Sequence, residues 1–237
     1  MTPLVLVHGF MGGSGQWQLQ APLADGREVI AVDLPGFGRN AHLDAIQSIP
    51  AFAEWVLSEV GAKRFDLLGH SMGGMIAQEM VRLAPERVRR LVLYATGAEG
   101  EIPGRFEPIE TSKQRAHSDG PKSTARRIAA TWFRDEEAAP EFPACAGVAE
   151  ASTLPAILAG LEAMPKWSGV VHLAGITAPT LVLWGDGDRT YSWAQTEKLW
   201  RNIPGCQLAV LPACAHAVHM ERPDLFNQLV REFLDAA

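Results

Sequence analysis

One serine lies in a spacing that can make it a nucleophile. Ser71 stands in the run Gly69-His70-Ser71-Met72-Gly73, with a glycine two residues before it and two residues after it. A serine on a sharp turn from a strand into a helix takes a strained backbone conformation, and its neighbours two positions away crowd the turn unless they are glycine. Such a turn lifts the hydroxyl clear of the sheet and sets it beside the positive end of a helix, where a developing oxyanion is stabilised.

The other groups that this chemistry needs follow two later apolar runs. A serine hydroxyl reacts well only when a base takes its proton and an anion orients that base. Asp186 and Asp188 follow the apolar run 180–184, and His216 and His219 follow the run 207–211. Ligands bind at the carboxyl ends of parallel strands, so these groups are expected to meet there. The order serine, acid, histidine along the chain is the one that the glycine-serine-glycine motif predicts.

The pattern of apolar residues predicts the elements that position these groups. Short apolar runs predict strands at 3–7, 28–33, 65–68, 90–94, 180–184 and 207–211. Helical periodicity predicts helices at 48–60, 72–84, 193–201 and 223–234. Strands that alternate with helices imply a parallel sheet that is covered on both faces. We therefore expect an α/β fold.

The alternation stops between residues 98 and 171. Seven prolines break this segment into short pieces, of which 122–133 and 154–164 are the clearest helices. The segment is expected to be an insertion of small helices. The predicted organisation is a core of residues 1–97 and 172–237, with a helical lid at 98–171.

Composition restricts the class of protein. A chain of 237 residues with a net charge of −6 lacks the excess of lysine and arginine that phosphate binding requires, so no nucleic-acid partner is expected. No apolar run approaches the length of a membrane span, so no membrane partner is expected. Three cysteines at irregular spacing fit a reducing cytoplasm better than a disulfide framework. We expect a cytoplasmic protein, either monomer or dimer.

Over nearly its whole length the chain resembles α/β-hydrolase-fold enzymes of the compact esterase and C–C-hydrolase branch. The resemblance is carried by His8-Gly9-Phe10, by residues 33–38, by residues 69–74, by residues 184–189 and by Cys214-Ala215-His216.

The resemblance implies a role for each matching residue. The acid of the family matches Asp188, and its base matches His216. It also implies an oxyanion hole formed by the backbone N–H groups of Phe10 and Met72. The family usually begins with a further β-hairpin, which this sequence lacks, so the strand at 28–32 is expected to form an edge of the sheet. The residue before the histidine, commonly glycine in the family, is Ala215.

The remaining polar residues near these motifs are expected to have other roles. Asp186 is the rival acid, and its alternative is a turn residue that bonds backbone. His219 is the rival base, for which a packing or lid-facing role is favoured. His8 and His70 are expected to orient loops, and Cys214 to be a buried, inert thiol. The serine mechanism already uses Asp188 and His216, so neither a metal nor a cofactor is expected.

The lid is expected to select the substrate. Trp132, Phe133, Leu158 and Trp167 could line an apolar acyl pocket, although the same side chains could pack the lid onto the core. Six basic residues occur between 113 and 134 against a single acid, Asp119. They fit a solvated helix face, or alternatively a docking surface for an acidic acyl carrier or a CoA thioester.

The sequence thus predicts a hydrolase of carboxylic esters that acts through an acyl-enzyme at Ser71 on modest-sized substrates with an apolar acyl part. The same groups would also serve a lactonase, a C–C-bond hydrolase of ring-cleavage products, or a thioesterase or carrier-ester esterase. A non-catalytic binding protein on this fold is the remaining alternative. A serine in place of an aspartate argues against haloalkane or epoxide hydrolysis, because those reactions form an alkyl ester on a carboxylate.

Overall fold

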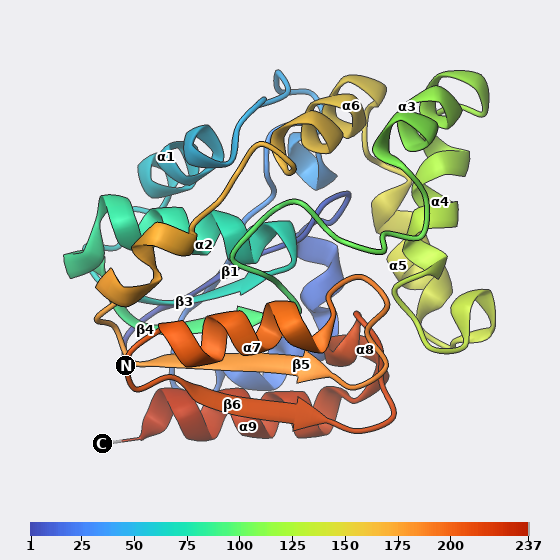
Figure 1. The fold of residues 1–237 in the computed structure, drawn as a ribbon. Coiled ribbons are helices and arrows are strands. Elements are labelled where there is room, and N and C mark those ends of the chain that lie inside the picture. The colour runs from blue at the N-terminus through green and yellow to red at the C-terminus, as the bar shows by residue number, and fades with distance from the viewer. Residues whose placement is uncertain (237) are drawn as a thin grey trace.

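The computed structural model describes residues 1–236 and contains a six-stranded sheet with helices on both faces (Figure 1). Every pair of neighbouring strands is parallel, and the order across the sheet is β2-β1-β3-β4-β5-β6. The strands are β1 (Leu4–Val7), β2 (Val29–Ala31), β3 (Phe65–His70), β4 (Val88–Tyr94), β5 (Thr180–Gly185) and β6 (Gln207–Leu211). This architecture confirms the predicted fold class, and β2 lies at an edge of the sheet as expected.

Helices cover the sheet and the ends of its strands. The α-helices of the core are α1 (Ile49–Glu59), α2 (Met72–Leu83), α7 (Trp193–Asn202), α8 (Val218–Glu221) and α9 (Pro223–Asp235). Short 3₁₀ segments are η1 (Ser14–Ala24), η2 (Gly38–Asn40), η3 (Pro85–Arg87), η4 (Glu136–Ala138) and η5 (Val170–Gly175). The start of α1 illustrates the local cause, because Ser48 Oγ accepts the Ala51 N–H at 3.3 Å and caps the helix.

Two apolar clusters lie on opposite faces of the sheet. Side chains alternate along a strand, so Leu67 packs toward α1 and α2, whereas its neighbour Leu68 packs toward α9 and η1. Phe52 of α1 belongs to the first cluster and Phe226 of α9 to the second. Because both faces of the four central strands are largely buried, these strands read as mostly continuous apolar runs in the sequence.

The segment between β4 and β5 holds four further α-helices, α3 (Ile109–Ser118), α4 (Pro121–Ala130), α5 (Phe142–Ala149) and α6 (Leu154–Ala163). In Figure 1, α3, α4 and α5 lie beyond the arrowheads of β5 and β6. The two ends of the segment pair with each other, since the Gly100 N–H donates to the Trp167 carbonyl at 3.0 Å and the Gly169 N–H to the Ala98 carbonyl at 2.8 Å. The segment therefore leaves and re-enters the core at one place.

Three elements carry no clear sequence signal. In η1 an internal proline and the absence of an apolar stripe hide the helical turns. In α3 only Ser112 and Ala116 are buried, so no apolar face marks the helix. The third, α5, is eight residues long and apolar on most sides. Within residues 1–236 no single helix is long and apolar enough to cross a membrane; α5 and α6 meet that test only as a pair, which is bent by 96° at the break between them.

Candidate active site

Ser71 occupies the sharp turn between β3 and α2. Its backbone has φ 56° and ψ −120°, a conformation that residues other than glycine rarely adopt. A Cβ at Gly69 would lie 2.3 Å from the Gly73 carbonyl oxygen, and a Cβ at Gly73 would lie 2.3 Å from the Val7 carbonyl oxygen. The two glycines therefore permit a turn that places Ser71 at the start of α2, against the loop that follows β1.

Further contacts hold the strained turn in place. The Ser71 N–H donates to the Tyr94 carbonyl at 3.0 Å, and the Thr96 hydroxyl donates to the Ser71 carbonyl at 2.7 Å. A Cβ at Gly74 would lie 2.5 Å from Thr96 Cγ2, so the first turn of α2 packs directly on the loop after β4. The backbone on both sides of the hydroxyl is thus fixed by neighbouring elements.

Asp188 and His216 come together at the carboxyl ends of β5 and β6. His216 Nδ1 lies 3.0 Å from Asp188 Oδ2, and both side chains are almost completely buried. The other carboxylate oxygen, Oδ1, accepts the backbone N–H groups of Thr190 at 2.7 Å and Tyr191 at 3.1 Å. The carboxylate is therefore oriented by its own loop and in turn orients the imidazole.

The His216 ring lies among aromatic rings next to the Ser71 turn. The centroid of the His70 ring is 4.7 Å from that of His216, and the Tyr191 ring stacks on His216 at 5.8 Å with an interplanar angle of 17°. The Tyr94 hydroxyl donates to the His216 carbonyl at 2.7 Å. Among residues 1–236, no hydrogen bond joins Ser71 Oγ to the His216 ring. Hydrogen bonds between catalytic groups are often long or poorly aligned until substrate binds, and then they tighten.

Two backbone N–H groups next to Ser71 are available to an anion. Met72 is the first residue of α2, so its N–H has no acceptor within the helix. The Phe10 N–H makes no backbone hydrogen bond in the part of the chain that the structure describes. Gly9, which precedes Phe10, lies against the serine, since a Cβ at Gly9 would be 2.9 Å from Ser71 Cβ. The geometry is that of an anion site at a helix N-terminus.

Ser71 opens into a small cavity of about 50 Å³. It is lined by Phe10, Ser71, Ile102, Arg105, Phe106, Ile128, Thr131, Trp132, Met164, Arg189, Thr190 and Tyr191. The wall of the cavity therefore combines the Ser71 turn, the loop after β5 and the lid.

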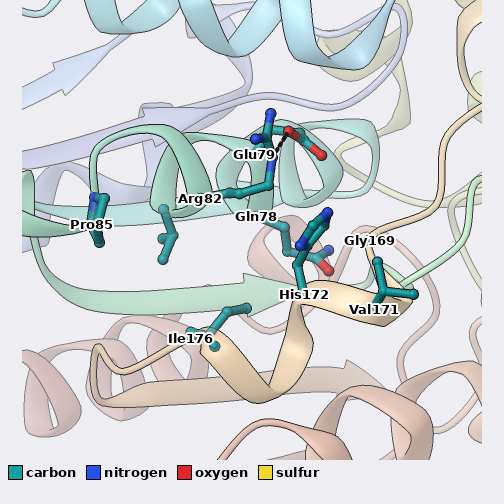
Figure 2. A pocket seen from close by; sticks show the side chains of 10 residues that line it. Gln78, Glu79, Arg82, Pro85, Gly169, Val171, His172 and Ile176 are labelled. Atoms are coloured by element: carbon teal, nitrogen blue, oxygen red, sulfur yellow. Dashed lines mark hydrogen bonds and ion pairs between the residues drawn. The ribbon is translucent and has the colours of Figure 1, made fainter.

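A larger cavity of about 220 Å³ lies along α2 and η5 (Figure 2), and Ser71 does not line it. Figure 2 shows the Arg82 side chain paired with Glu79, and Nε lies 2.7 Å from the carboxylate. Gln78 and His172 also line this cavity, but none of the residues around it belongs to the serine site. The smaller cavity is the candidate active site because Ser71 lines it.

Only one of the four lid residues expected in the acyl pocket lines this cavity. Trp132 lines it, whereas Phe133 is completely buried in the first apolar cluster and its ring packs edge-to-face against Phe142. Leu158 lies in a separate depression between α3 and α6, and Trp167 Nε1 donates to Glu79 Oε1 at 2.8 Å. The expectation is not met for Phe133, Leu158 and Trp167, because apolar composition does not separate side chains that line a pocket from those that pack the lid on the core.

The sequence reasoning missed Arg105 and Tyr191, which line the cavity. Tyr191 lies three residues after Asp188 on the same loop, and this position is the only signal that could have found it. Arg105 lies in the lid segment before α3, where no motif marks it.

The rival acid and base have other partners. Asp186 Oδ1 accepts the Ala213 N–H at 2.8 Å, so it joins the loops after β5 and β6 and not the imidazole. His219 packs between Tyr94 and Trp17, with Nδ1 3.1 Å from the Tyr94 hydroxyl and its ring centroid 4.8 Å from that of Trp17. Burial lowers the pKa of His219 to about 3, as expected for a packing histidine.

The histidines that flank the site contact the backbone of neighbouring loops, and the nearby Cys214 thiol is buried. His8 Nε2 accepts the Leu34 N–H at 2.9 Å, and burial lowers the pKa of His8 to about 4. His70 Nε2 lies 3.3 Å from the His216 carbonyl oxygen. Burial raises the pKa of the Cys214 thiol to about 12, so it has little thiolate character. Within residues 1–236, no three histidine, cysteine, aspartate or glutamate side chains lie together so that they could hold a metal ion.

Most of the basic side chains of the lid already have acidic partners. Lys113 pairs with Glu110 and Glu162, and the Arg126 guanidinium lies 2.8 Å from Glu137. Arg115 and Arg127 both pair with Glu107, at 3.5 Å and 2.7 Å. These ion pairs reduce the positive field that a docking surface for an acidic carrier would present.

Comparison with known proteins places the whole architecture in one family. The model of the alpha/beta hydrolase family matches residues 4–229. The dihydrolipoyllysine-residue acetyltransferase component of an acetoin-cleaving system from Pseudomonas putida is 32% identical over 98% of this chain, which spans only 63% of that protein's length.

Two further comparisons cover most of both chains. The 2-hydroxy-6-oxononadienedioate/2-hydroxy-6-oxononatrienedioate hydrolase of Burkholderia vietnamiensis is 30% identical, over 98% of this chain and 86% of that protein. The malate-bound structure of a thermophilic esterase from Thermogutta terrifontis is 28% identical, with a TM-score of 0.85 over 99% of this chain and 89% of that chain. With its matching fold and serine turn, the chain belongs to the alpha/beta hydrolase family.

Proposed function

We propose that this hydrolase cleaves carboxylic esters through an acyl-enzyme at Ser71, with His216 as the base and Asp188 as the residue that orients the base. The observation that carries the proposal is the 3.0 Å hydrogen bond between His216 and Asp188, formed at the strand ends beside a strained serine at a helix N-terminus. This arrangement supports nucleophilic catalysis because it supplies a nucleophile, a base and an oriented anion in one place.

The order of events follows from the atoms. With its Nδ1 proton donated to Asp188, His216 presents an unprotonated Nε2 that takes the Ser71 proton as Oγ attacks the ester carbonyl. The N–H groups of Phe10 and Met72 hold the oxyanion of the tetrahedral intermediate. The bond between the carbonyl carbon and the alkoxy oxygen then breaks, and His216 gives the proton to the departing oxygen, which leaves as the alcohol. A water molecule activated by the same imidazole cleaves the acyl-enzyme and restores Ser71.

The comparisons support hydrolysis but leave the bond type open. The Thermogutta protein is named an esterase and the Burkholderia protein a hydrolase of a dienedioate, so lactone or C–C-bond hydrolysis by the same residues is the alternative. Turnover of vinylogous diketones or enol-lactones far above that of simple esters would identify the alternative. A carrier-bound or CoA-bound substrate has less support than a simple ester, because the ion pairs within the lid reduce the positive field that would attract an acidic partner.

The test compares the wild-type enzyme with Ser71→Ala on p-nitrophenyl acetate and butyrate. We expect the variant to lose at least about 10³-fold in kcat, and a fluorophosphonate to label only the wild type. Residual activity of the variant within tenfold of the wild type would remove Ser71 from the mechanism. A panel of esters of graded acyl length, lactones and thioesters then assigns the bond type.

A further inference from the structure

The cavity beside Ser71 carries positive charge without matching negative charge. Arg105 and Arg189 both line it, and no aspartate or glutamate belongs to the lining that the structure describes. Arg189 is already satisfied, since its Nη1 lies 3.0 Å from Glu136 Oε1 and its Nη2 donates to the Phe133 carbonyl at 2.7 Å. Arg105 is therefore the cation to explain.

Among the described residues, Arg105 has no charged partner within 4 Å and only weak hydrogen bonds, and its guanidinium lies over the Phe106 ring, 5.3 Å from the centroid. Its Nη1 donates to the Glu107 carbonyl at 3.4 Å and to the Ser112 hydroxyl at 3.3 Å, both longer than ordinary hydrogen bonds. The nearest carboxylate, on Glu107, is instead bound by Arg127 at 2.7 Å and by the Ser112 hydroxyl at 2.6 Å. Within residues 1–236, no carboxylate oxygen lies within 4 Å of the Arg105 guanidinium.

Such a guanidinium has lost part of its water without a carboxylate bound directly to it. Arg105 is half-buried, and burial lowers the pKa of its guanidinium. The cost of removing a charge from water is recovered only when a partner of opposite charge binds it with good geometry. The planar fork of arginine matches a carboxylate with two parallel hydrogen bonds. A carboxylate on a bound molecule would supply the partner that the protein does not.

Tyr191 adds a neutral donor on the same wall. Its side chain is completely buried, and its hydroxyl has no hydrogen-bond partner among the described residues. Burial raises the pKa of this hydroxyl, and the side chains of Ser71 and Thr96 lie beside it and partly offset that rise, although neither meets the geometry of a hydrogen bond. Buried hydroxyls are rarely left unpaired, so an unpaired one beside the nucleophile indicates a place for a substrate oxygen.

We propose that Arg105 and Tyr191 form a subsite for an anionic acyl group, so that the preferred substrates are esters whose acyl part carries a carboxylate. The proposal rests on ester hydrolysis at Ser71 and names the substrate class of that site. Arg105 binds the carboxylate, and the Tyr191 hydroxyl donates to an oxygen nearer the scissile carbonyl. Ile102, Phe106 and Met164, which line the same cavity, contact the methylene groups between the two ends.

The first measurement is the preference for the anionic substrate, taken as the ratio of kcat/KM for a monomethyl ester to kcat/KM for the neutral dimethyl ester. The monomethyl esters of succinate, glutarate and adipate cover a range of chain lengths. We expect the wild type to prefer at least one monomethyl ester, and Arg105→Gln to lose roughly 10- to 100-fold of that preference.

A matched control removes the same charge from the outer surface of the lid. Arg126 does not line the cavity, and it pairs with Glu137. Arg126→Gln should retain the preference for the monomethyl ester. The proposal is overturned if the wild type shows no preference for any of the three monomethyl esters, if Arg105→Gln keeps the preference, or if Arg126→Gln loses it equally.

The second measurement is independent of turnover. Calorimetry on Ser71→Ala should show binding of the preferred monomethyl ester, roughly 10- to 100-fold weaker once Arg105→Gln is added, and weaker also with Tyr191→Phe. Equal binding by all three proteins overturns the subsite. Anion-selective binding by a protein that hydrolyses no ester would refute the proposed function and leave the subsite standing, whereas hydrolysis without selectivity would do the reverse.

Discussion

The substitution Asp188→Asn tests the proposed role of the carboxylate. Oδ1 of Asp188 accepts two backbone N–H groups, from Thr190 and Tyr191, and Oδ2 faces His216 Nδ1 at 3.0 Å. In the variant, the amide oxygen has to stay toward the two N–H groups, because an NH₂ group there would face donors. The amide NH₂ group then faces Nδ1, which becomes an acceptor, and the ring proton moves to Nε2.

This change blocks the first step without removing any loop contact. An Nε2 that carries a proton is unable to take the proton of Ser71. The same substitution in a serine protease lowers kcat by about 10⁴, and we expect a loss of about 10³- to 10⁴-fold, or about 4–5.5 kcal/mol in activation free energy. Because the loop hydrogen bonds remain, the free energy of unfolding should change by less than about 2 kcal/mol.

Initial rates with p-nitrophenyl butyrate measure the loss, and urea unfolding checks that the variant is folded. Asp186→Asn is the control, because Asp186 contacts the Ala213 N–H and not the imidazole. Its kcat should stay within a few-fold of the wild type. The reasoning is refuted if folded Asp188→Asn retains more than a tenth of the wild-type kcat, or if Asp186→Asn is the variant that loses activity.

Two other predictions concern the fold that holds the site. Gly73→Ala places a Cβ 2.3 Å from the Val7 carbonyl oxygen, so it should lower the melting temperature and abolish ester hydrolysis, measured by thermal unfolding and initial rates; wild-type stability would contradict the tight turn. His8 and His219 have folded-state pKa values of about 4 and about 3, so below pH 6.5 the unfolded state binds protons that the folded state does not. As the pH is lowered from 6.5 to 4.5, the free energy of unfolding should therefore fall by about 1.4 kcal/mol per pH unit for each histidine. Urea unfolding of His219→Phe at several pH values should show a pH dependence of this free energy that is smaller by the contribution of about one proton.

Local patterns account for the features that were predicted correctly. The six strands and the serine turn are written in contiguous residues, because an apolar run or a glycine two positions from a serine constrains the backbone directly. The polar helix α3 and the proline-containing η1 were not predicted, since neither carries an apolar stripe. The lid was expected as small helices, but its composition did not show which side chains face the serine.

The sequence by itself determined the fold class and the position of the strained serine turn, because both depend on short-range sterics and on the period of buried residues. The residues alone left two aspartates and two histidines as candidates, and resemblance to a family chose between them. Only the tertiary structure placed Asp188 against His216 and Asp186 against Ala213. It alone brought Arg105 to the wall that Tyr191 lines, 86 positions later in the chain (191 − 105), because such contacts depend on how the lid packs over the strand ends.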